Sequence, residues 1–308
     1  MLRALFISLS ESRFLRNFAE QSSLGQRISG RFVAGTQVED ALNVTRALNR
    51  AGLGVSVDNL GENVSNADEA RHSAQLYRQL LSEISARGFN ANVSLKLTHM
   101  GLDVAPQLAC DNVSALVAQA AAMQPKNFVR VDMEGSAYTQ RTLDLVRELH
   151  RNPENRGCVG AVIQSYMRRA EDDIASLLKD GIRIRLCKGA YKEPPEIAYQ
   201  SKAEVDSNYV RLMKILLKSG IYHGLATHDE RIIRQAKEFA AGENVPRDTF
   251  EFQMLHGIRR DLQQSLVREG WRMRVYVPFG REWYPYLMRR LAERPANALF
   301  VARNLFRN

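Results

Sequence analysis

The feature that most constrains the fold is an alternation of short apolar runs with amphipathic stretches of ten or more residues. Repeated units of this kind are typical of parallel strands connected by helices. Eight such units, with no intervening linker, predict a single (β/α)8 barrel of the TIM type. The runs, rich in Val, Ile and Phe, occupy residues 54–60, 91–97, 127–133, 159–164, 181–187, 223–228, 249–255 and 273–278.

The region before the first strand has helical periodicity, in residues 4–20 and again in 38–52. We expect residues 1–50 to form a helical lead-in that packs on the barrel, and residues 51–308 to form the barrel within one domain. The longest predicted helix covers 194–220. A doubly wound open sheet is the alternative fold, but no G-x-G-x-x-G pattern follows the first strand.

Composition and charge argue against several classes of protein. The 43 Lys and Arg residues against 34 Asp and Glu give a net charge of +9, but the basic residues form no tract. Since no nucleic-acid motif occurs either, we expect no nucleic-acid partner, whereas contact with a membrane surface is more plausible. Three cysteines without metal-type spacing, and no H-E-x-x-H pattern, indicate a reducing compartment and no metal site. No apolar run reaches the roughly 20 residues that span a bilayer, so we expect a cytoplasmic protein.

Polar side chains recur where the predicted strands end. The strand ends of a barrel meet at one face, and polar groups there are typical of catalytic sites. A single such residue is more often a cap, a salt bridge or a solvated charge. Six strand ends of the same character favour an active site, and they carry Lys96, Asp132, Gln164, Arg185 with Lys188, Thr227 with His228, and Tyr276.

The last predicted helix carries the sharpest local signal. Tyr286, Arg289, Arg290 and Glu293 stand at i, i+3, i+4 and i+7, so they share one helical face. Two guanidinium groups one turn from an aromatic ring suit a small carboxylate on an apolar body, because arginine binds carboxylates with two parallel hydrogen bonds. The alternative is a surface ion pair between Arg290 and Glu293, which leaves Tyr286 unexplained.

A Lys-Gly-Ala turn follows the fifth predicted strand. Glycine at 189 allows backbone N–H groups to approach a phosphate or a cofactor ring, although such turns are common. Lys96 or Lys188 at a strand end is also a feature of Schiff-base aldolases on barrels. An aldolase and a non-enzymatic basic binding module therefore remain alternative functions.

Six segments, in this order along the chain, resemble the monofunctional bacterial proline dehydrogenases. The resemblance runs essentially from end to end. It implies a distorted barrel with non-covalent FAD at its C-terminal face and a final helix over its mouth. The segments are VSLKLTHMGLD (93–103), FVRVDMEGSAYT (128–139), VIQSYMRRAEDDI (162–174), IRIRLCKGAYKEP (182–194), ATHD (226–229) and VYVPFGREWYPYLMRRLAERPAN (275–297). Several members carry Gln where His99 stands here.

The resemblance also implies roles for individual residues. Arg185 would lie near flavin N5 and, with Asp132, would be catalytic, while His228 would lie near the polar side of the cofactor. The residues implied to hold FAD are Met133, Gln164, Arg185, Lys188, Gly189, Ala190, Thr227 and His228. The residues implied to bind proline are Lys96, Arg289 and Arg290 at the carboxylate, Tyr276 and Tyr286 at the ring, and Glu293 as a partner that aligns the arginines.

The implied reaction is oxidation of L-proline to Δ1-pyrroline-5-carboxylate by hydride transfer to FAD, the first step of proline catabolism to glutamate. A membrane quinone would then accept the electrons. Contact with the inner face of the cytoplasmic membrane would be peripheral, and basic residues such as Arg13 and Arg16 are candidates for that contact.

Overall fold

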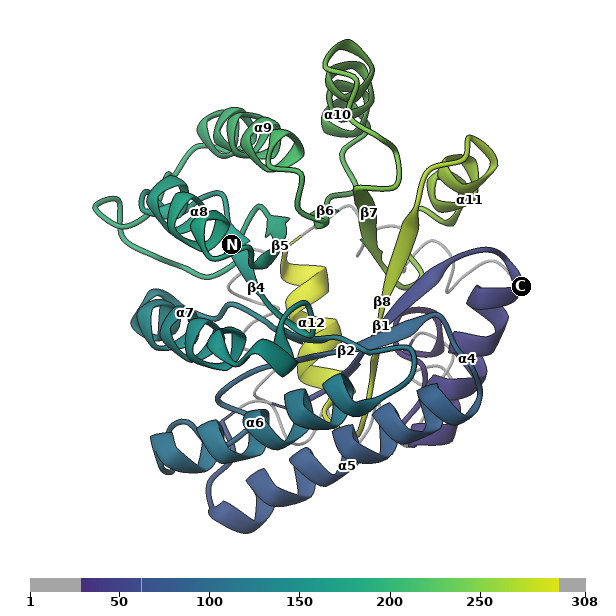
Figure 1. The fold of residues 1–308 in the computed structure, drawn as a ribbon, viewed down its shortest axis with the longest axis vertical. Helices are drawn as coiled ribbons and strands as arrows, with labels where there is room; N and C mark the ends of the chain where they lie inside the picture. The colour runs from purple at the N-terminus through teal and green to yellow at the C-terminus, as the bar shows by residue number, and fades with distance from the viewer. Residues whose placement is uncertain (1–28, 62, 294–308) are drawn as a thin grey trace.

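The computed structural model describes residues 29–61 and 63–293, with side chains up to residue 288. Within these residues eight parallel strands close into a barrel, each strand pairing with its sequence neighbours (Figure 1). β1 closes the barrel by pairing with β8, where Val55 lies opposite Val275. The strands are β1 (Gly54–Asn59), β2 (Ala91–Leu95), β3 (Val129–Val131), β4 (Val159–Gln164), β5 (Arg183–Cys187), β6 (His223–Ala226), β7 (Phe250–Leu255) and β8 (Met273–Phe279).

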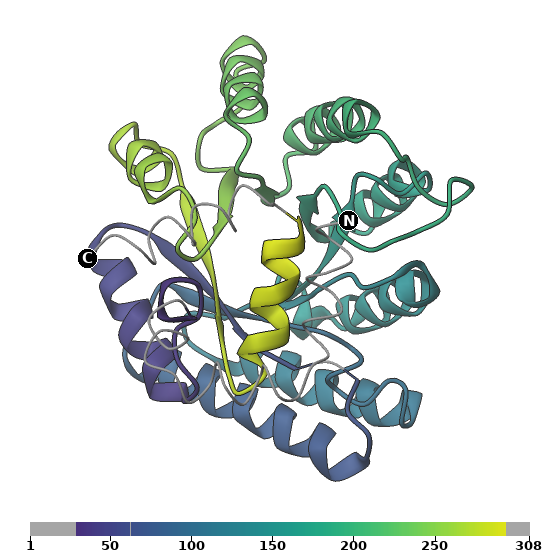
Figure 2. The ribbon, with the colours of Figure 1, turned by 180° about the vertical axis from the view of Figure 1, so that it is seen from behind.

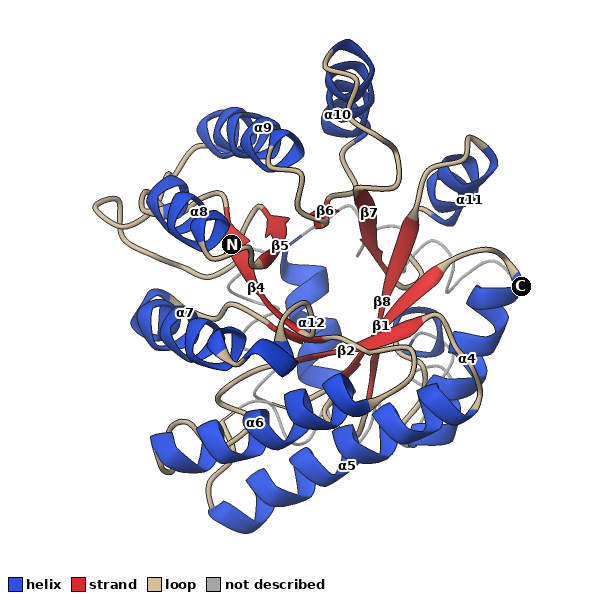
Figure 3. Cartoon of the chain, in the orientation of Figure 1, coloured by secondary structure: helices blue, strands red, loops and turns tan. Residues whose placement is uncertain are grey.

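Helices surround the strands as an outer layer (Figure 3). They are α4 (Val38–Arg50), α5 (Ala67–Ala86), α6 (Pro106–Ala122), α7 (Ser136–Arg151), α8 (Ala170–Lys179), α9 (Lys202–Lys218), α10 (Glu230–Gly242) and α11 (Arg260–Arg268), with a short 3-10 helix, η1 (Pro153–Asn155). A further helix, α12 (Trp283–Glu293), lies inside this ring in the view of Figure 3. The predicted barrel is confirmed, and each predicted strand agrees with an observed one to within two residues at either end.

The strands alternate in what they bury. Apolar side chains such as Val55, Val57 and Ile184 belong to one large hydrophobic core. The intervening residues of the same strands include Ser56 and Arg185, and Arg185 Nη2 donates a hydrogen bond to Ser56 Oγ inside the barrel. The interior of this barrel is therefore partly polar, beyond the strand ends where polar residues were predicted.

The predicted helix over 194–220 is wrong at its start, because α9 begins only at Lys202. Ser201 and Glu204 form a capping box, in which each side chain accepts a hydrogen bond from the other residue's backbone N–H. The residues before it form a turn instead, in which Ala198 pairs with Met167.

The last helix lies across one end of the barrel (Figure 2), as the resemblance implied. Trp283, Tyr286 and Leu287 of α12 pack with Phe32 and Val33 in a second hydrophobic cluster, separate from the main core. The N-terminal side of the chain thus holds the helix in place. α4 packs against β1 and β8, whereas residues 1–28 of the predicted lead-in lie outside the described residues, so the division at residue 50 stays a prediction.

Candidate active site

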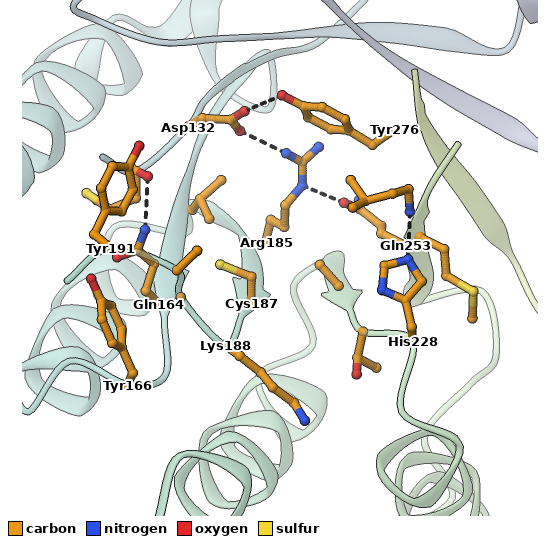
Figure 4. A pocket seen from close by; sticks show the side chains of 18 of the residues that line it. Asp132, Gln164, Tyr166, Arg185, Cys187, Lys188, Tyr191, His228, Gln253 and Tyr276 are labelled. Atoms are coloured by element: carbon orange, nitrogen blue, oxygen red, sulfur yellow. Dashed lines mark hydrogen bonds and ion pairs between the residues drawn. The ribbon is translucent and has the colours of Figure 1, made fainter. Parts of the chain in front are cut away.

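A cavity of about 640 Å³ opens at the carboxyl ends of the strands (Figure 4), and Tyr286 of α12 contributes to its lining. All the predicted site residues whose side chains are described line it: Lys96, Asp132, Met133, Gln164, Arg185, Lys188, Gly189, Ala190, Thr227, His228, Tyr276 and Tyr286. Arg289, Arg290 and Glu293 belong to α12, but their side chains lie outside the described residues. The volume is in the usual range for a small-molecule site.

Arg185 of β5 lies at the centre of the floor of this cavity and is almost fully buried. Its Nη1 donates to Asp132 Oδ1 at 2.8 Å and to Ser94 Oγ at 3.0 Å, and its Nε donates to Gln253 Oε1 at 2.5 Å. The guanidinium also lies over the ring of Tyr276, 5.2 Å from its centroid. A cation held on several sides in this way presents a fixed charge to the cavity.

Asp132 follows β3, and both of its carboxylate oxygens accept hydrogen bonds. Besides the bond from Arg185, Oδ1 accepts from Ser94 Oγ at 2.7 Å, and Oδ2 accepts from the Tyr276 hydroxyl at 2.9 Å. Burial raises the pKa of Tyr276 well above its usual value, and the nearby charge of Asp132 adds to this effect. Tyr276 therefore remains a neutral phenol that donates to Asp132.

Lys96 follows β2 and pairs with Asp58 of β1, its Nζ lying 3.5 Å from Asp58 Oδ2. Burial raises the pKa of Asp58, although the charge of Lys96 acts in the opposite direction. The Tyr77 hydroxyl donates to the other oxygen of Asp58 at 3.1 Å. The lysine ammonium is thus anchored from below, at the edge of the cavity.

The opposite wall is formed by the ends of β4 and β5. Gln164 Nε2 donates to the carbonyl of Met133 at 3.0 Å, while its Oε1 is buried without a protein partner. Gly189 has a φ of +101°, and a Cβ there would come within 2.2 Å of the Tyr166 ring. A side chain at 189 would therefore be strained and would clash with Tyr166.

Lys188 and His228, two further predicted site residues, are held in position by protein partners. Lys188 Nζ pairs with Asp206 at 2.5 Å and with Asp229 at 3.0 Å. His228 Nε2 accepts from the backbone N–H of Leu255 at 3.0 Å, so the proton of the neutral ring lies on Nδ1.

Sequence reasoning missed several residues that shape this cavity. Gln253 and Tyr166 line it, and Asp58 and Ser94 support it from below. Three of them lie within strands, and Tyr166 lies in the turn after β4. The only signal for them in the sequence is a polar residue in a mostly apolar run. Among residues 29–61 and 63–293 no group of His, Cys, Asp and Glu side chains suits a metal ion. No helix in the described part of the chain is long and apolar enough to cross a membrane.

Comparisons with known proteins agree with one another. The sequence model of the family described as "Proline dehydrogenase" matches residues 41–303. Proline dehydrogenase 1 of Bacillus subtilis (strain 168) is 40% identical over 308 residues, covering 100% of this chain and 100% of that protein. Proline dehydrogenase of Deinococcus radiodurans is 39% identical over 312 residues, which is 100% of this chain and 98% of that protein.

A solved structure is also similar, the proline utilization A protein (PutA) of Bdellovibrio bacteriovorus inactivated by N-propargylglycine. The TM-score is 0.81 with 27% identity, over 87% of this chain. The match covers 33% of that longer chain, so this chain spans about a third of its length.

Proposed function

The chain belongs to the proline dehydrogenase family, and from this premise we propose how its cavity oxidises L-proline to Δ1-pyrroline-5-carboxylate with a non-covalently bound FAD. Proline oxidation, the first step of proline catabolism, is the activity of the chain. The aldolase and the binding module that the sequence left open have no support from the family. The observation that carries the proposal is one cavity that holds a fixed arginine, a lysine, and a buried acceptor without a partner.

The residues present fit a flavin. The Oε1 of Gln164 is buried without a protein partner, so it would accept a hydrogen bond from a bound flavin, whose isoalloxazine ring carries an N–H donor. Gly189 lies in the wall of the cavity, and its φ of +101° and the Tyr166 ring beside it set the course of the turn after β5. The residues that would hold FAD are Met133, Gln164, Arg185, Lys188, Gly189, Ala190, Thr227 and His228. When bound, the flavin supplies the acceptor for the hydride that leaves the ring carbon beside the proline nitrogen.

Substrate binding is the task of the opposite side of the cavity. We assign the proline carboxylate to Lys96 together with Arg289 and Arg290 of α12, and the pyrrolidine ring to Tyr276 and Tyr286. Tyr286 is buried and lines the cavity, which supports a role for α12 as its lid. Glu293 would keep the two arginines aligned.

The charges of the cavity favour the reactive form of the substrate. The ammonium form of proline does not readily release a hydride, and nearby cations destabilise it relative to the neutral amine. Arg185 also stabilises negative charge that develops on the acceptor side of the reaction. Asp132 acts through its hydrogen bonds, because it fixes Arg185 and Tyr276 at their places beside the substrate.

Electrons leave the protein in a second half-reaction. We propose a membrane quinone as their acceptor, reached by peripheral contact of an otherwise cytoplasmic protein with the inner face of the cytoplasmic membrane. The resemblance to the family supports this assignment. Reduction by the proline-reduced protein of a lipid-soluble quinone embedded in anionic vesicles is the expected result, and no transfer to that quinone would refute it.

The substrate assignment has a direct test. Arg289→Met should raise the KM for proline steeply, by about tenfold or more, because it removes a charged hydrogen-bonding group. Arg141→Met, at an exposed position of α7, is the matched control and should leave KM unchanged. An unchanged KM in Arg289→Met would show that the carboxylate binds elsewhere.

A further inference from the structure

We propose that Gln253 is a positioning residue that holds Arg185 in place for the reaction. In this proposal Glu251 orients the amide of Gln253, and Gly224 leaves the space that the amide occupies. The inference rests on the proposed function, since Arg185 is assigned there to the flavin. Gln253 and Glu251 lie on β7, two strands away from Arg185 on β5.

The amide of Gln253 links a cation to an anion. Its Oε1 accepts from Arg185 Nε at 2.5 Å (Figure 4), and its Nε2 donates to Glu251 Oε1 at 2.6 Å. A flipped amide would place its NH₂ against the guanidinium and its oxygen against the carboxylate. Because both contacts would then be repulsive, Glu251 dictates the orientation in which Gln253 meets Arg185.

Glu251 is itself held firmly. Arg274 Nε donates to its two oxygens at 2.7 and 3.0 Å, and the Tyr222 hydroxyl donates to Oε2 at 2.8 Å. Burial acts to raise the pKa of Glu251, but the charge and hydrogen bond of Arg274 outweigh it and keep this pKa below its usual value. The carboxylate is therefore a permanent anchor for the amide.

Gly224 of β6 provides the space through which Gln253 reaches Arg185. In the strand register it lies between its two neighbours, opposite Arg185 on one side and Glu251 on the other. A Cβ at 224 would come within 2.4 Å of Gln253 Nε2. Gly224 does not have a positive φ, so backbone conformation does not require glycine here.

The result is a hydrogen-bonded chain from the rear of the barrel to its mouth, running from Arg274 through Glu251 and Gln253 to Arg185. Asp132 holds the guanidinium at Nη1, and Gln253 holds it at Nε. Two contacts at different nitrogens fix the plane of the guanidinium as well as its position. Without Gln253 the Nε atom loses its acceptor, and the guanidinium keeps only its contacts at Nη1, with Asp132 and Ser94, and at Nη2, with Ser56.

The test uses the purified, FAD-loaded protein and three variants, Gln253→Ala, Gly224→Ala and the double variant. Each single change should make the midpoint potential of the bound flavin more negative, because a misplaced Arg185 stabilises the reduced form less. It should also slow flavin reduction by proline about tenfold with KM nearly unchanged. The double variant should behave like Gln253→Ala alone, since Gly224 acts only by leaving room for the glutamine.

Controls separate the possible failures. Gly242→Ala at the end of α10, where a Cβ meets nothing within 4 Å, should match the unmodified protein. If Gln253→Ala does not fold, Gln253→Met keeps the volume and carries the same expectation. Unchanged potential and rate in a folded Gln253 variant, or additive effects in the double variant, would overturn the inference. Unmodified protein that binds no flavin would instead overturn the proposed function.

Discussion

The hydrogen bonds of Asp132 show how single residues create the site. One carboxylate accepts from Arg185, Ser94 and Tyr276, which come from three different strands. Buried hydrogen bonds to a charged group contribute more than those between neutral groups, typically about 1.5–3 kcal/mol. Each donor should therefore make a measurable contribution to holding the carboxylate in position.

Removal of the Tyr276 hydroxyl tests this contribution. Tyr276→Phe should lower kcat/KM for proline about tenfold, because Asp132 Oδ2 loses its donor while the ring remains. Steady-state kinetics with a dye acceptor measures the effect. Tyr138→Phe is the matched control, since the Tyr138 hydroxyl donates to Asp103 at an exposed position. Equal kinetics for the two variants would contradict the role given to Tyr276.

Site residues at strand ends could be predicted because the barrel brings those ends together whatever the details of its sequence. Their partners could not be predicted in the same way. Gln253 and Asp58 lie inside strands, and a sequence does not tell which neighbour an inward-facing polar side chain meets. Those contacts depend on register and on small residues such as Gly224.

Among the elements, α9 and α12 show which boundaries a sequence pattern conceals. Apolar periodicity continued from 194 into α9, so the predicted helix was too long, and the capping box of Ser201 and Glu204 decides the start. α12 was predicted from spacing alone, and its cluster with Phe32 and Val33 appears only in the fold.

Loss of the cap should shorten α9 without damage to the site. Ser201→Ala is expected to lower the free energy of unfolding by about 1 kcal/mol, the usual value of an N-cap. Urea denaturation measures this change. Ser85→Ala, at an exposed position inside α5, serves as the control and should leave stability equal or slightly higher. An unchanged free energy of unfolding in Ser201→Ala would mean that tertiary packing sets the start of α9.

The position of α12 should matter for substrate binding separately from stability. Leu287→Ala removes a buried side chain from the cluster under α12, so we expect a higher KM for proline as Arg289 and Arg290 move. Leu266→Ala on α11, equally buried but in the main core, should cost about 2–5 kcal/mol of stability with KM unchanged. The same KM in both variants would contradict the lid role of α12.

Across the whole molecule, the barrel combines an apolar outer core with a hydrogen-bonded interior. The interior network runs through Asn92, Ser56, Arg185, Ser94, Asp132, Tyr276, Gln253, Glu251 and Arg274. The alternation of apolar runs with amphipathic stretches was enough to predict the barrel, because helices cover the outer face of the strands and require apolar residues there. The polar residues inside the barrel support the site, and no periodic pattern in the sequence predicts them.

Buried neutral histidines should make the whole fold sensitive to acid. Burial lowers the pKa of His99 to about 4, of His223 to about 3 and of His256 to about 4. Unfolded histidines titrate near pH 6.5, so the unfolded chain binds more protons below that value. The contribution of these histidines to the free energy of unfolding should be fully present above pH 6.5. It should fall toward pH 4 by up to about 1.4 kcal/mol per pH unit for each histidine.

Denaturant unfolding at a series of pH values measures this slope. His99→Gln keeps a partner for Ser73 and removes one titrating group, so its slope between pH 6.5 and 4 should be smaller by up to about 1.4 kcal/mol per pH unit. The same slope in both proteins would mean that His99 titrates in the folded protein as it does in the unfolded chain.

The most direct test of the account is an anaerobic titration of the purified protein with L-proline, followed through the visible absorbance of its bound cofactor. We expect a flavin spectrum that bleaches as proline is added, and FAD in the supernatant after denaturation. A protein without a flavin spectrum, or a flavin that proline leaves oxidised, would contradict the assignment of this cavity.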